Sequence, residues 1–317
     1  MTQRMLTRLL VVLLGIALSS CLGCSGVPRG AAGALPECGG ELGGFSHHSV
    51  EVNRVRLHYV IGGQDPAVVL LHGFPETWWT WRQVMPLLAQ THTVIAPDLR
   101  GIGCSSPASA GYDAQTLAQD VHELVASLGL PRVALVGHDL GGWAAYAYAR
   151  QYRDQVSHLV LSGAALPGFG LERLLDFRQP GQGLAHLAFF TQPRIPELLI
   201  GGREREYFAA FIASPEMQRS GAIDFYARSY ARPGRLSAAL GQYRALYTDA
   251  QDNRRGAGPA LTMPTLALAG VGETQLSADS LRQVARNVTE VGIPHAGHYL
   301  QEEHPAELAR ALEQFLG

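Results

Sequence analysis

A Gly-x-Asp-x-Gly motif at residues 137–141 places one carboxylate, Asp139, in a pattern typical of an enzymatic nucleophile. The apolar residues 133–136 before it predict a buried strand, and residues 143–152 after it predict a helix. So tight a turn leaves no room for side chains two positions before and two positions after the central residue. The glycines therefore fit a nucleophile, and the alternative that this motif leaves open is an aspartate that caps a helix.

Histidines near the C-terminus supply the base that such a nucleophile needs. His295, His298 and His304 precede the last helical pattern. A histidine can take a proton from water because its unperturbed pKa, about 6.5, lies near neutral. We expect His298 to be the base, because it follows Gly297 and because the expected chain order is nucleophile, acid, histidine.

Two further motifs predict the groups that assist these residues. The apolar run 265–269 ends near Glu273, whose carboxylate can orient the ring of His298, and the alternative is a solvated loop carboxylate. The His-Gly-Phe-Pro sequence at residues 72–75 follows another apolar run. We expect the backbone N–H groups of Phe74 and Leu140 to form an oxyanion hole, whereas a simple Gly-Pro turn would leave the full pattern unexplained.

Short apolar runs alternate with helical patterns and predict the elements that position these residues. Residues 50–53 and 55–59 predict an antiparallel pair. Six further runs predict strands: 67–71, 93–96, 133–136, 159–161, 265–269 and 288–291. Strands in alternation with helices, such as 115–128 and 305–315, indicate a mostly parallel sheet with helices on both faces. Residues 164–260 are helical and rich in Arg and Tyr, and they predict an inserted lid because no sheet connection needs that length.

Together these motifs resemble the epoxide hydrolase branch of the α/β-hydrolase superfamily. The likeness covers nearly all of residues 50–317 and rests on residues 72–78, 96–103, 137–141 and 297–300. It implies an α/β-hydrolase fold, with a mostly parallel eight-stranded sheet flanked by helices and an inserted helical lid. The core would comprise residues 46–163 and 261–317, and the lid residues 164–260.

The lid more narrowly resembles the Cif-like subgroup of secreted bacterial hydrolases, at residues 225–233 and 242–246. This likeness implies that His186 and Tyr243 hold the epoxide oxygen, and packing within the lid is the alternative for both. One departure concerns the relay acid, which in that subgroup follows the strand before the lid. Gly163 stands at that position here, so Glu273 is the expected relay acid.

The resemblance implies a two-step reaction that needs no metal and no organic cofactor. Asp139 would attack a carbon of a small-molecule epoxide and form an ester, with Tyr243 and His186 donating to the opening oxygen. Water activated by His298 would then release a vicinal diol.

Two other functions compete with epoxide opening. Haloalkane dehalogenases use the same nucleophile but normally place Trp after it, and haloacetate dehalogenases place Arg there, whereas Leu140 and two glycines stand here. A non-catalytic surface binding protein on the same fold would tend to lose the nucleophile or the base, and Asp139 and His298 are both present.

Composition and the N-terminus predict where the protein acts. The net charge is −2 with no basic run, which argues against nucleic acid, and the absence of Lys excludes Schiff-base and P-loop chemistry. Residues 1–20 predict a signal peptide, and the small residues before Cys21 predict its lipidation as an exported lipoprotein. The alternatives are an ordinary signal peptide and an uncleaved anchor. Residues 21–45 predict a flexible tether, so membrane contact is expected only through the lipid anchor.

Cysteine positions and assembly complete the expectations. Cys21, Cys24 and Cys38 lie in the leader or tether and Cys104 lies alone in the folded part, so we expect neither a metal site nor a disulfide framework. The sequence leaves the oligomeric state open, and a homodimer is compatible with it.

Overall fold

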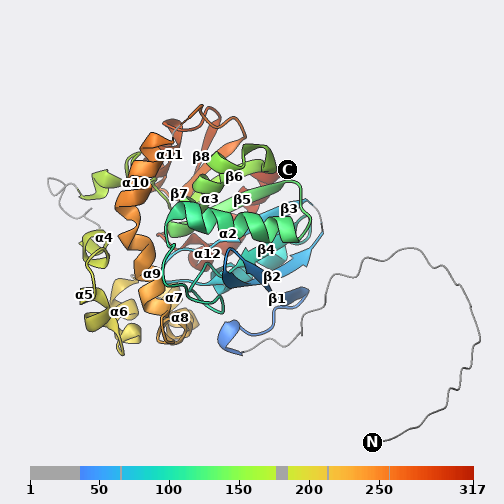
Figure 1. Ribbon diagram of the computed structural model, residues 1–317. Helices are drawn as coiled ribbons and strands as arrows, with labels where there is room; N and C mark the ends of the chain where they lie inside the picture. Colours follow the sequence, from blue (N-terminus) through green and yellow to red (C-terminus); the bar gives the residue numbers. More distant parts are fainter. Residues whose placement is uncertain (1–35, 65, 176–184, 213, 257) are drawn as a thin grey trace, which may run out of the picture. The chain divides into compact units, whose positions relative to one another are not determined.

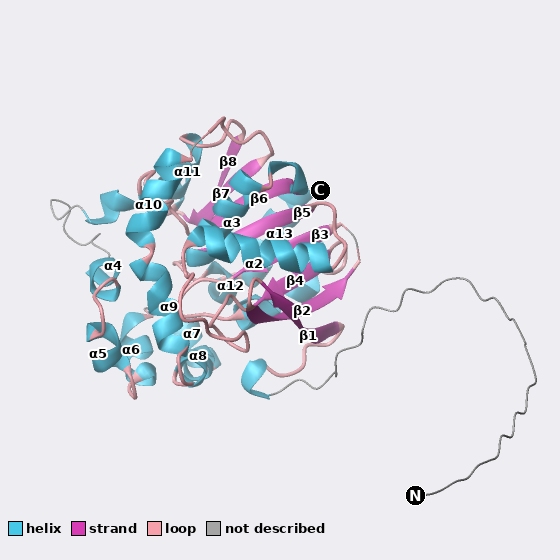
Figure 2. Ribbon diagram, viewed as in Figure 1, coloured by secondary structure: helices cyan, strands magenta, loops and turns pink. Residues whose placement is uncertain are grey.

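Eight strands form one sheet in the computed structural model, which describes residues 36–64, 66–175, 185–212, 214–256 and 258–317. Its spatial order is β1-β2-β4-β3-β5-β6-β7-β8 (Figure 2). The first two strands pair antiparallel with each other, and β2 pairs antiparallel with β4, whereas all later neighbours are parallel. The strands are β1 (Phe45–Val52), β2 (Val55–Gly63), β3 (Ala67–Leu71), β4 (Thr93–Pro97), β5 (Val133–His138), β6 (Val156–Ser162), β7 (Thr265–Gly270) and β8 (Val288–Ile293). The predicted fold class is confirmed.

Helices cover both faces of this sheet because its central strands are apolar on both sides. Every residue of β3, β5 and β7 is buried, as expected for parallel strands enclosed by helices. One core cluster packs under α2 (Ala114–Ser127), α3 (Leu140–Gln151) and α11 (Thr274–Arg282). A second lies under η2 (Trp78–Gln83), α1 (Met85–Leu88) and α13 (Pro305–Leu316). The short elements η3 (Arg153–Gln155) and α12 (Leu300–Glu303) complete this part.

The described parts of the segment between β6 and β7 are mainly helical, and their role as a lid stays a prediction. We call residues 164–260 the lid segment. Its described elements are η4 (Leu171–Leu175), α4 (Ala185–Phe190), α5 (Ile195–Ile200), α6 (Glu204–Phe211), α7 (Pro215–Ser220), α8 (Ala222–Tyr230), α9 (Arg235–Arg244) and α10 (Leu246–Arg255). Figure 1 shows α4 to α9, in yellow to orange, beside the sheet rather than on its faces. Within the described ranges, no helix combines the length and the apolar character needed to cross a membrane.

The N-terminal segment from residue 36 onward is bound to the domain, which corrects two expectations. Cys38, in η1 (Pro36–Cys38), forms a disulfide with Cys104 across 66 residues of sequence. The indole N–H of Trp78 donates to the carbonyl of Cys38 at 2.5 Å, and His47 Nε2 donates to that of Gly40 at 2.8 Å. The expectation that Cys104 stands alone is wrong, because sequence spacing does not report which segments meet in space. The last ten residues of the predicted tether are likewise not free, whereas Cys21 lies outside the described residues.

Candidate active site

Asp139 occupies the tight turn between β5 and α3, with φ 49° and ψ −120°. A Cβ atom at Gly137 would collide with the backbone of Gly141, and one at Gly141 would collide with the carbonyl oxygen of Leu71. The predicted steric need for both glycines is therefore confirmed. The Asp139 side chain makes no hydrogen bond that caps α3, which argues against its reading as a simple helix cap.

The loop after β3 brings a backbone donor to this carboxylate. The N–H of Phe74 donates to Oδ2 of Asp139 at 3.0 Å. The preceding Gly73 permits this approach, because a Cβ atom there would lie 2.5 Å from Cβ of Asp139. Leu140, the other expected oxyanion donor, begins α3 with a buried side chain. Phe74 thus meets Asp139 as the sequence predicts, and the oxyanion role of both N–H groups stays a prediction.

His298 and Glu273 form a pair at the ends of neighbouring strands. The loop after β8 carries His298, whose Nδ1 lies 3.1 Å from Oε2 of Glu273 in the loop after β7. Burial lowers the pKa of His298, but the hydrogen bond and charge of Glu273, followed by the charges of Asp139 and Glu76, outweigh it and raise this pKa to about 9. Burial raises the pKa of Glu273, but the hydrogen bond and charge of His298 hold it below its usual value.

The two other C-terminal histidines lie apart from this pair. His295 is exposed on the outer part of the same loop, and Nδ1 of His304 lies 4.0 Å from a carboxylate oxygen of Glu307. Neither contacts Glu273 or Asp139 in the described structure. The geometry therefore brings His298, and not its neighbours, to the expected position of the base.

A buried polar network behind the site was missed by the sequence reasoning. His138, the residue before the nucleophile, has Nδ1 2.9 Å from Oε2 of Glu76 and Nε2 2.9 Å from the carbonyl oxygen of His298. The other oxygen of Glu76 accepts hydrogen bonds from Thr80 at 2.6 Å and from Gln301 at 2.5 Å. Burial raises the pKa of Glu76, but the charge and hydrogen bond of His138 dominate and lower it to about 2.

This network joins the three loops that carry the site. Glu76 also accepts the N–H of Gly73 at 3.1 Å, so its carboxylate is fixed to the loop of Phe74. The sequence held a signal for this part of the site, because Glu76 and His138 both lie inside motifs whose functions were assigned to other residues. The two residues stand 62 positions apart in the chain, so no local spacing predicts their contact.

Lid side chains converge over Phe74. Its ring lies 5.5 Å from that of Tyr243 in α9 and 5.1 Å from that of Phe190 in α4, in edge-to-face geometry. His186, one turn before Phe190, has its ring centroid 6.2 Å from that of Tyr243. The structure therefore brings both predicted oxygen-binding residues together next to the loop that touches Asp139.

Burial and the charge of Asp139 fix the protonation of these two donors. Burial, and then the charge of Asp139, raise the pKa of Tyr243 well above its usual value. Burial lowers the pKa of His186 more than the charge of Asp139 raises it. At neutral pH the phenol keeps its proton and the imidazole is neutral, so each can donate one hydrogen bond.

Among the residues that the structure describes, no arginine is one of the groups whose charges act most strongly on His186, Tyr243 and His298. Trp143, the nearest tryptophan in sequence to the nucleophile, donates its indole N–H to the carbonyl of Ala165 at 2.9 Å. The described site therefore lacks the arginine expected of a pocket for a substrate carboxylate, and the indole N–H of Trp143 is not free to bind a halide.

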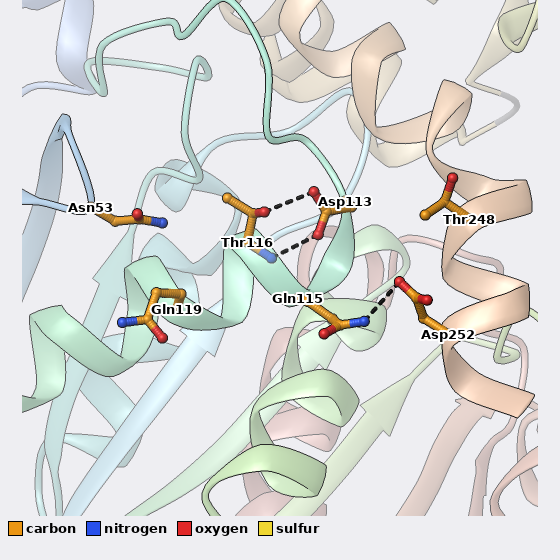
Figure 3. Close-up of a pocket in the computed structure, with 7 residues that line it drawn as sticks. All are labelled: Asn53, Asp113, Gln115, Thr116, Gln119, Thr248 and Asp252. Atoms are coloured by element: carbon orange, nitrogen blue, oxygen red, sulfur yellow. Dashed lines mark hydrogen bonds between the residues drawn. The ribbon is translucent and has the colours of Figure 1, made fainter. Parts of the chain in front are cut away.

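A separate open cleft lies between α2 and α10 (Figure 3). Its volume is about 470 Å³, and it is lined by polar residues: Asn53, Asp113, Gln115, Thr116, Gln119, Thr248 and Asp252. None of the predicted site residues lines it, so it is distinct from the site at Asp139.

Comparisons with known proteins agree with this geometry. A family model described as alpha/beta hydrolase fold matches residues 66–305. A soluble epoxide hydrolase from Corynebacterium sp. (strain C12) is 34% identical, over 82% of this chain and 93% of that protein. A fluoroacetate dehalogenase from Burkholderia sp. is 31% identical, over 86% of this chain and 94% of that protein.

Solved structures extend the likeness to the whole described domain. Cfl2 from Burkholderia cenocepacia superposes with a TM-score of 0.82 at 39% identity, covering 87% of this chain and 97% of that one. The Cif epoxide hydrolase from Acinetobacter nosocomialis superposes with a TM-score of 0.82 at 25% identity, covering 92% and 99%. This chain belongs to the α/β-hydrolase superfamily, in its epoxide hydrolase branch.

Proposed function

We propose that this enzyme opens an epoxide to a vicinal diol through a covalent ester on Asp139. One observation carries the proposal: the carboxylate of Asp139 accepts the Phe74 N–H, and its charge acts both on His298, which contacts Glu273, and on Tyr243 of the lid segment.

The first step opens the ring. A carboxylate oxygen of Asp139 attacks one epoxide carbon, and the bond between that carbon and the ring oxygen breaks. The oxygen leaves as an alkoxide, so it needs a proton or strong hydrogen bonds as charge develops. Tyr243, which keeps its phenol proton, supplies the proton, and neutral His186 donates a second hydrogen bond.

The second step hydrolyses the ester. After ring opening, the proton that His298 carries in the free enzyme returns to the Tyr243 phenolate through solvent. His298 then takes a proton from water, and the resulting hydroxide attacks the ester carbonyl of Asp139. The N–H groups of Phe74 and Leu140 stabilise the oxyanion, which collapses as the leaving diol oxygen takes the carboxyl proton and the carboxylate re-forms. Esterification also removes the negative charge of Asp139, one of the charges that raise the pKa of His298. Ester formation therefore lowers the proton affinity of His298 just when it must act as a base.

Trapping of the ester tests this mechanism. His298→Gln, soaked with styrene oxide and an aliphatic epoxide, should gain one epoxide mass on the peptide that contains Asp139. His295→Gln is the matched control, because its exposed imidazole lies in the same loop, and it should turn over without an adduct. Asp139→Asn should form none. Absence of adduct and diol with every epoxide would refute the proposal.

Dehalogenation is the second candidate, because one relative is a fluoroacetate dehalogenase at 31% identity. Both reactions would use an ester on Asp139, so the adduct alone does not separate them. Halide release from haloalkanes and fluoroacetate should be absent where Leu140 and the glycines replace Trp or Arg. Halide release without diol formation would assign the chain to dehalogenation, and lack of either reaction would favour a non-catalytic binding protein.

We further propose that the protein is exported and lipidated at Cys21. The leader pattern of residues 1–20 supports this proposal. The Cys38–Cys104 disulfide supports it independently, because disulfides persist mainly in oxidising compartments. Cys21→Ser should release the protein from membranes into the soluble fraction of the cell envelope. Membrane association equal to that of the natural protein would refute lipidation. A homodimer stays a prediction, which light scattering on the purified protein can test.

A further inference from the structure

An apolar surface gathers on one short helix of the lid segment. Of the five large hydrophobic side chains that are exposed among the described residues, three lie on α5: Ile195, Leu198 and Leu199. Their exposed fractions are 47%, 81% and 48%. Isolated exposed leucines are common, but three on six consecutive helical residues form a contiguous patch that needs an explanation.

Helical geometry turns these three side chains to the same side. Positions i, i+3 and i+4 of a helix share one face, and the three residues occupy those positions. Pro196 and Ile200 are buried and hold the opposite face against the domain. A surface helix normally turns its polar face outward, whereas α5 is apolar on both faces. Its outer face, made of Ile195, Leu198 and Leu199, is called the α5 patch below.

The charged residues around the α5 patch favour contact with a negatively charged surface or a membrane interface. Exposed Arg194 precedes the helix and exposed Arg203 follows it. The acid within the helix, Glu197, forms a salt bridge with Arg244, whose Nη2 lies 2.7 Å from both of its carboxylate oxygens. An apolar face bounded by arginines is the composition of helices that lie in a membrane interface.

The size of the α5 patch argues for a lipid surface over a second copy of this chain. Stable protein interfaces use about 20–30 residues from each partner, and three apolar side chains fall far short of that. Interfacial anchoring needs only a few apolar side chains when a second attachment already holds the protein at the membrane.

The N-terminal segment supplies that second attachment, a step that rests on the proposed lipidation of Cys21. Fourteen residues separate Cys21 from Pro36, where the described structure begins. Fully extended, they span about 50 Å, since each residue adds up to about 3.6 Å. A domain of this size has a radius of gyration of roughly 19 Å, so the tether allows any of its faces to reach the same bilayer.

We propose that the α5 patch rests on the phospholipid surface to which the protein is tethered. The same helix is braced against the site, because Glu197 binds Arg244, the neighbour of Tyr243 on α9. The aromatic side chains around Phe74 form an apolar environment beside α5.

A spin label placed on α5 tests the contact without any activity measurement. Leu198→Cys is made in the lipidated full chain with Cys24→Ser, which removes the remaining thiol outside the disulfide because Cys21 carries the lipid, and is labelled with a nitroxide. Tyr247→Cys, at an exposed site on α10 (70% exposed), is the matched control. Vesicles contain phosphatidylcholine with about 30% phosphatidylglycerol. We expect the label at 198 to become accessible to oxygen and shielded from a water-soluble nickel chelate, and the label at 247 to stay in water.

Three results would overturn the proposal. The first is a label at residue 198 that stays accessible to the nickel chelate while the protein is bound to vesicles, and the second is a lack of any vesicle binding. The third is dipolar broadening between labels on two copies of the protein without vesicles, which would assign the patch to self-association. A second variant keeps the test independent of labelling. Leu198→Asp should reduce vesicle binding of the lipidated protein about tenfold, because it removes apolar area from the contact and adds a charge that the interface must desolvate. Tyr247→Asp should leave it unchanged. Vesicle binding can fail while diol formation persists, so this proposal and the proposed function fail separately.

Discussion

Nδ1 of His298 lies 3.1 Å from Oε2 of Glu273, and this contact places the orienting acid after β7 rather than after β6. Glutamate is one methylene longer than aspartate, and the loop after β7 accommodates that length with the carboxylate still in reach. The pair engages Nδ1 of His298, so in the proposed mechanism Nε2 is the atom that takes the proton from water.

Removal of the Glu273 charge should separate the two chemical steps. Glu273→Gln keeps an oxygen acceptor but loses the charge that, with its hydrogen bond, raises the pKa of His298 to about 9. We expect ester formation at a nearly normal rate and ester hydrolysis slowed by about 100-fold or more, since general-base catalysis contributes about 10²–10⁴-fold. The pH profile of hydrolysis should move to lower pH. Rapid-quench mass spectrometry measures both steps, with Asp279→Asn, at a partly exposed position on α11, as control. Unchanged hydrolysis would show that Glu273 is not the relay acid.

A relay acid introduced at Gly163 should restore part of that loss. A Cβ atom at Gly163 would lie 3.4 Å from Nδ1 of His298. Gly163 has φ +56°, a region that Asp tolerates better than most residues, at a stability cost of about 1–3 kcal/mol. In the Glu273→Gln background, Gly163→Asp should speed ester hydrolysis about tenfold. Gly163→Ala imposes the same backbone strain without a carboxylate and should give no gain. Equal effects of both substitutions would contradict the expectation.

The buried contact between Glu76 and His138 should stabilise the fold as well as the site. Removal of a buried hydrogen-bond acceptor leaves its donors unsatisfied, at a cost of about 1–3 kcal/mol. Glu76→Gln should therefore lower the free energy of unfolding by that amount at pH 7, as measured by urea denaturation. Because the pKa of Glu76 is lowered to about 2, its stabilisation is complete above the usual value of 4.5 and is lost as pH falls from there towards 2. Glu307→Gln, at an exposed position, should change neither quantity.

The sequence predicts those parts of the structure that depend on local pattern. All eight strands, the turn at Asp139 and the position of His298 follow from apolar runs, glycine spacing and chain order. These features are local or repeat a fixed order along the chain, so a single sequence suffices to recognise them.

Contacts between distant segments could not be predicted in the same way. The disulfide of Cys38 depends on where the N-terminal segment docks, and the Glu76–His138 contact depends on how three loops meet at one sheet edge. A cysteine in a Gly-rich stretch and a histidine beside a nucleophile carry no spacing signal for such partners. Tertiary packing, and not local propensity, decides them.

The disulfide should contribute measurably to stability. It ties the N-terminal segment to the loop after β4, and closing a chain segment of this length restricts the unfolded state. Cys38→Ser and Cys104→Ser should each lower the free energy of unfolding by about 2–4 kcal/mol, and the double variant by no more than either alone. Cys24→Ser is the matched control outside the disulfide. A reductant should destabilise the natural protein and leave Cys104→Ser unchanged. Additive losses in the double variant would contradict a shared bond.

Asp249 should make the attachment of α10 to α2 depend on pH. Its carboxylate is buried and accepts the N–H of Ala114 at 2.9 Å. Burial raises the pKa of Asp249 to about 7, opposed by the Ala114 N–H and assisted by the charges of Asp113 and Asp252. A raised acid pKa means that the folded protein holds a proton that the unfolded chain releases. The contribution of Asp249 to stability is therefore greatest below the usual pKa of 3.8 and falls as pH rises towards 7.

Asp249→Asn should abolish this dependence, because the amide keeps an acceptor oxygen for Ala114 without a charge to bury. Relative to the natural protein, the variant should gain stability steadily between about pH 4 and pH 7 and hold that gain at higher pH. Denaturant unfolding at pH 5, 6, 7 and 8 measures the difference. Asp252→Asn, on the same helix but partly exposed, should show a much weaker trend. A stability difference that does not change with pH would show that Asp249 stays ionised in the folded protein, and its burial would then be offset by contacts other than the Ala114 N–H.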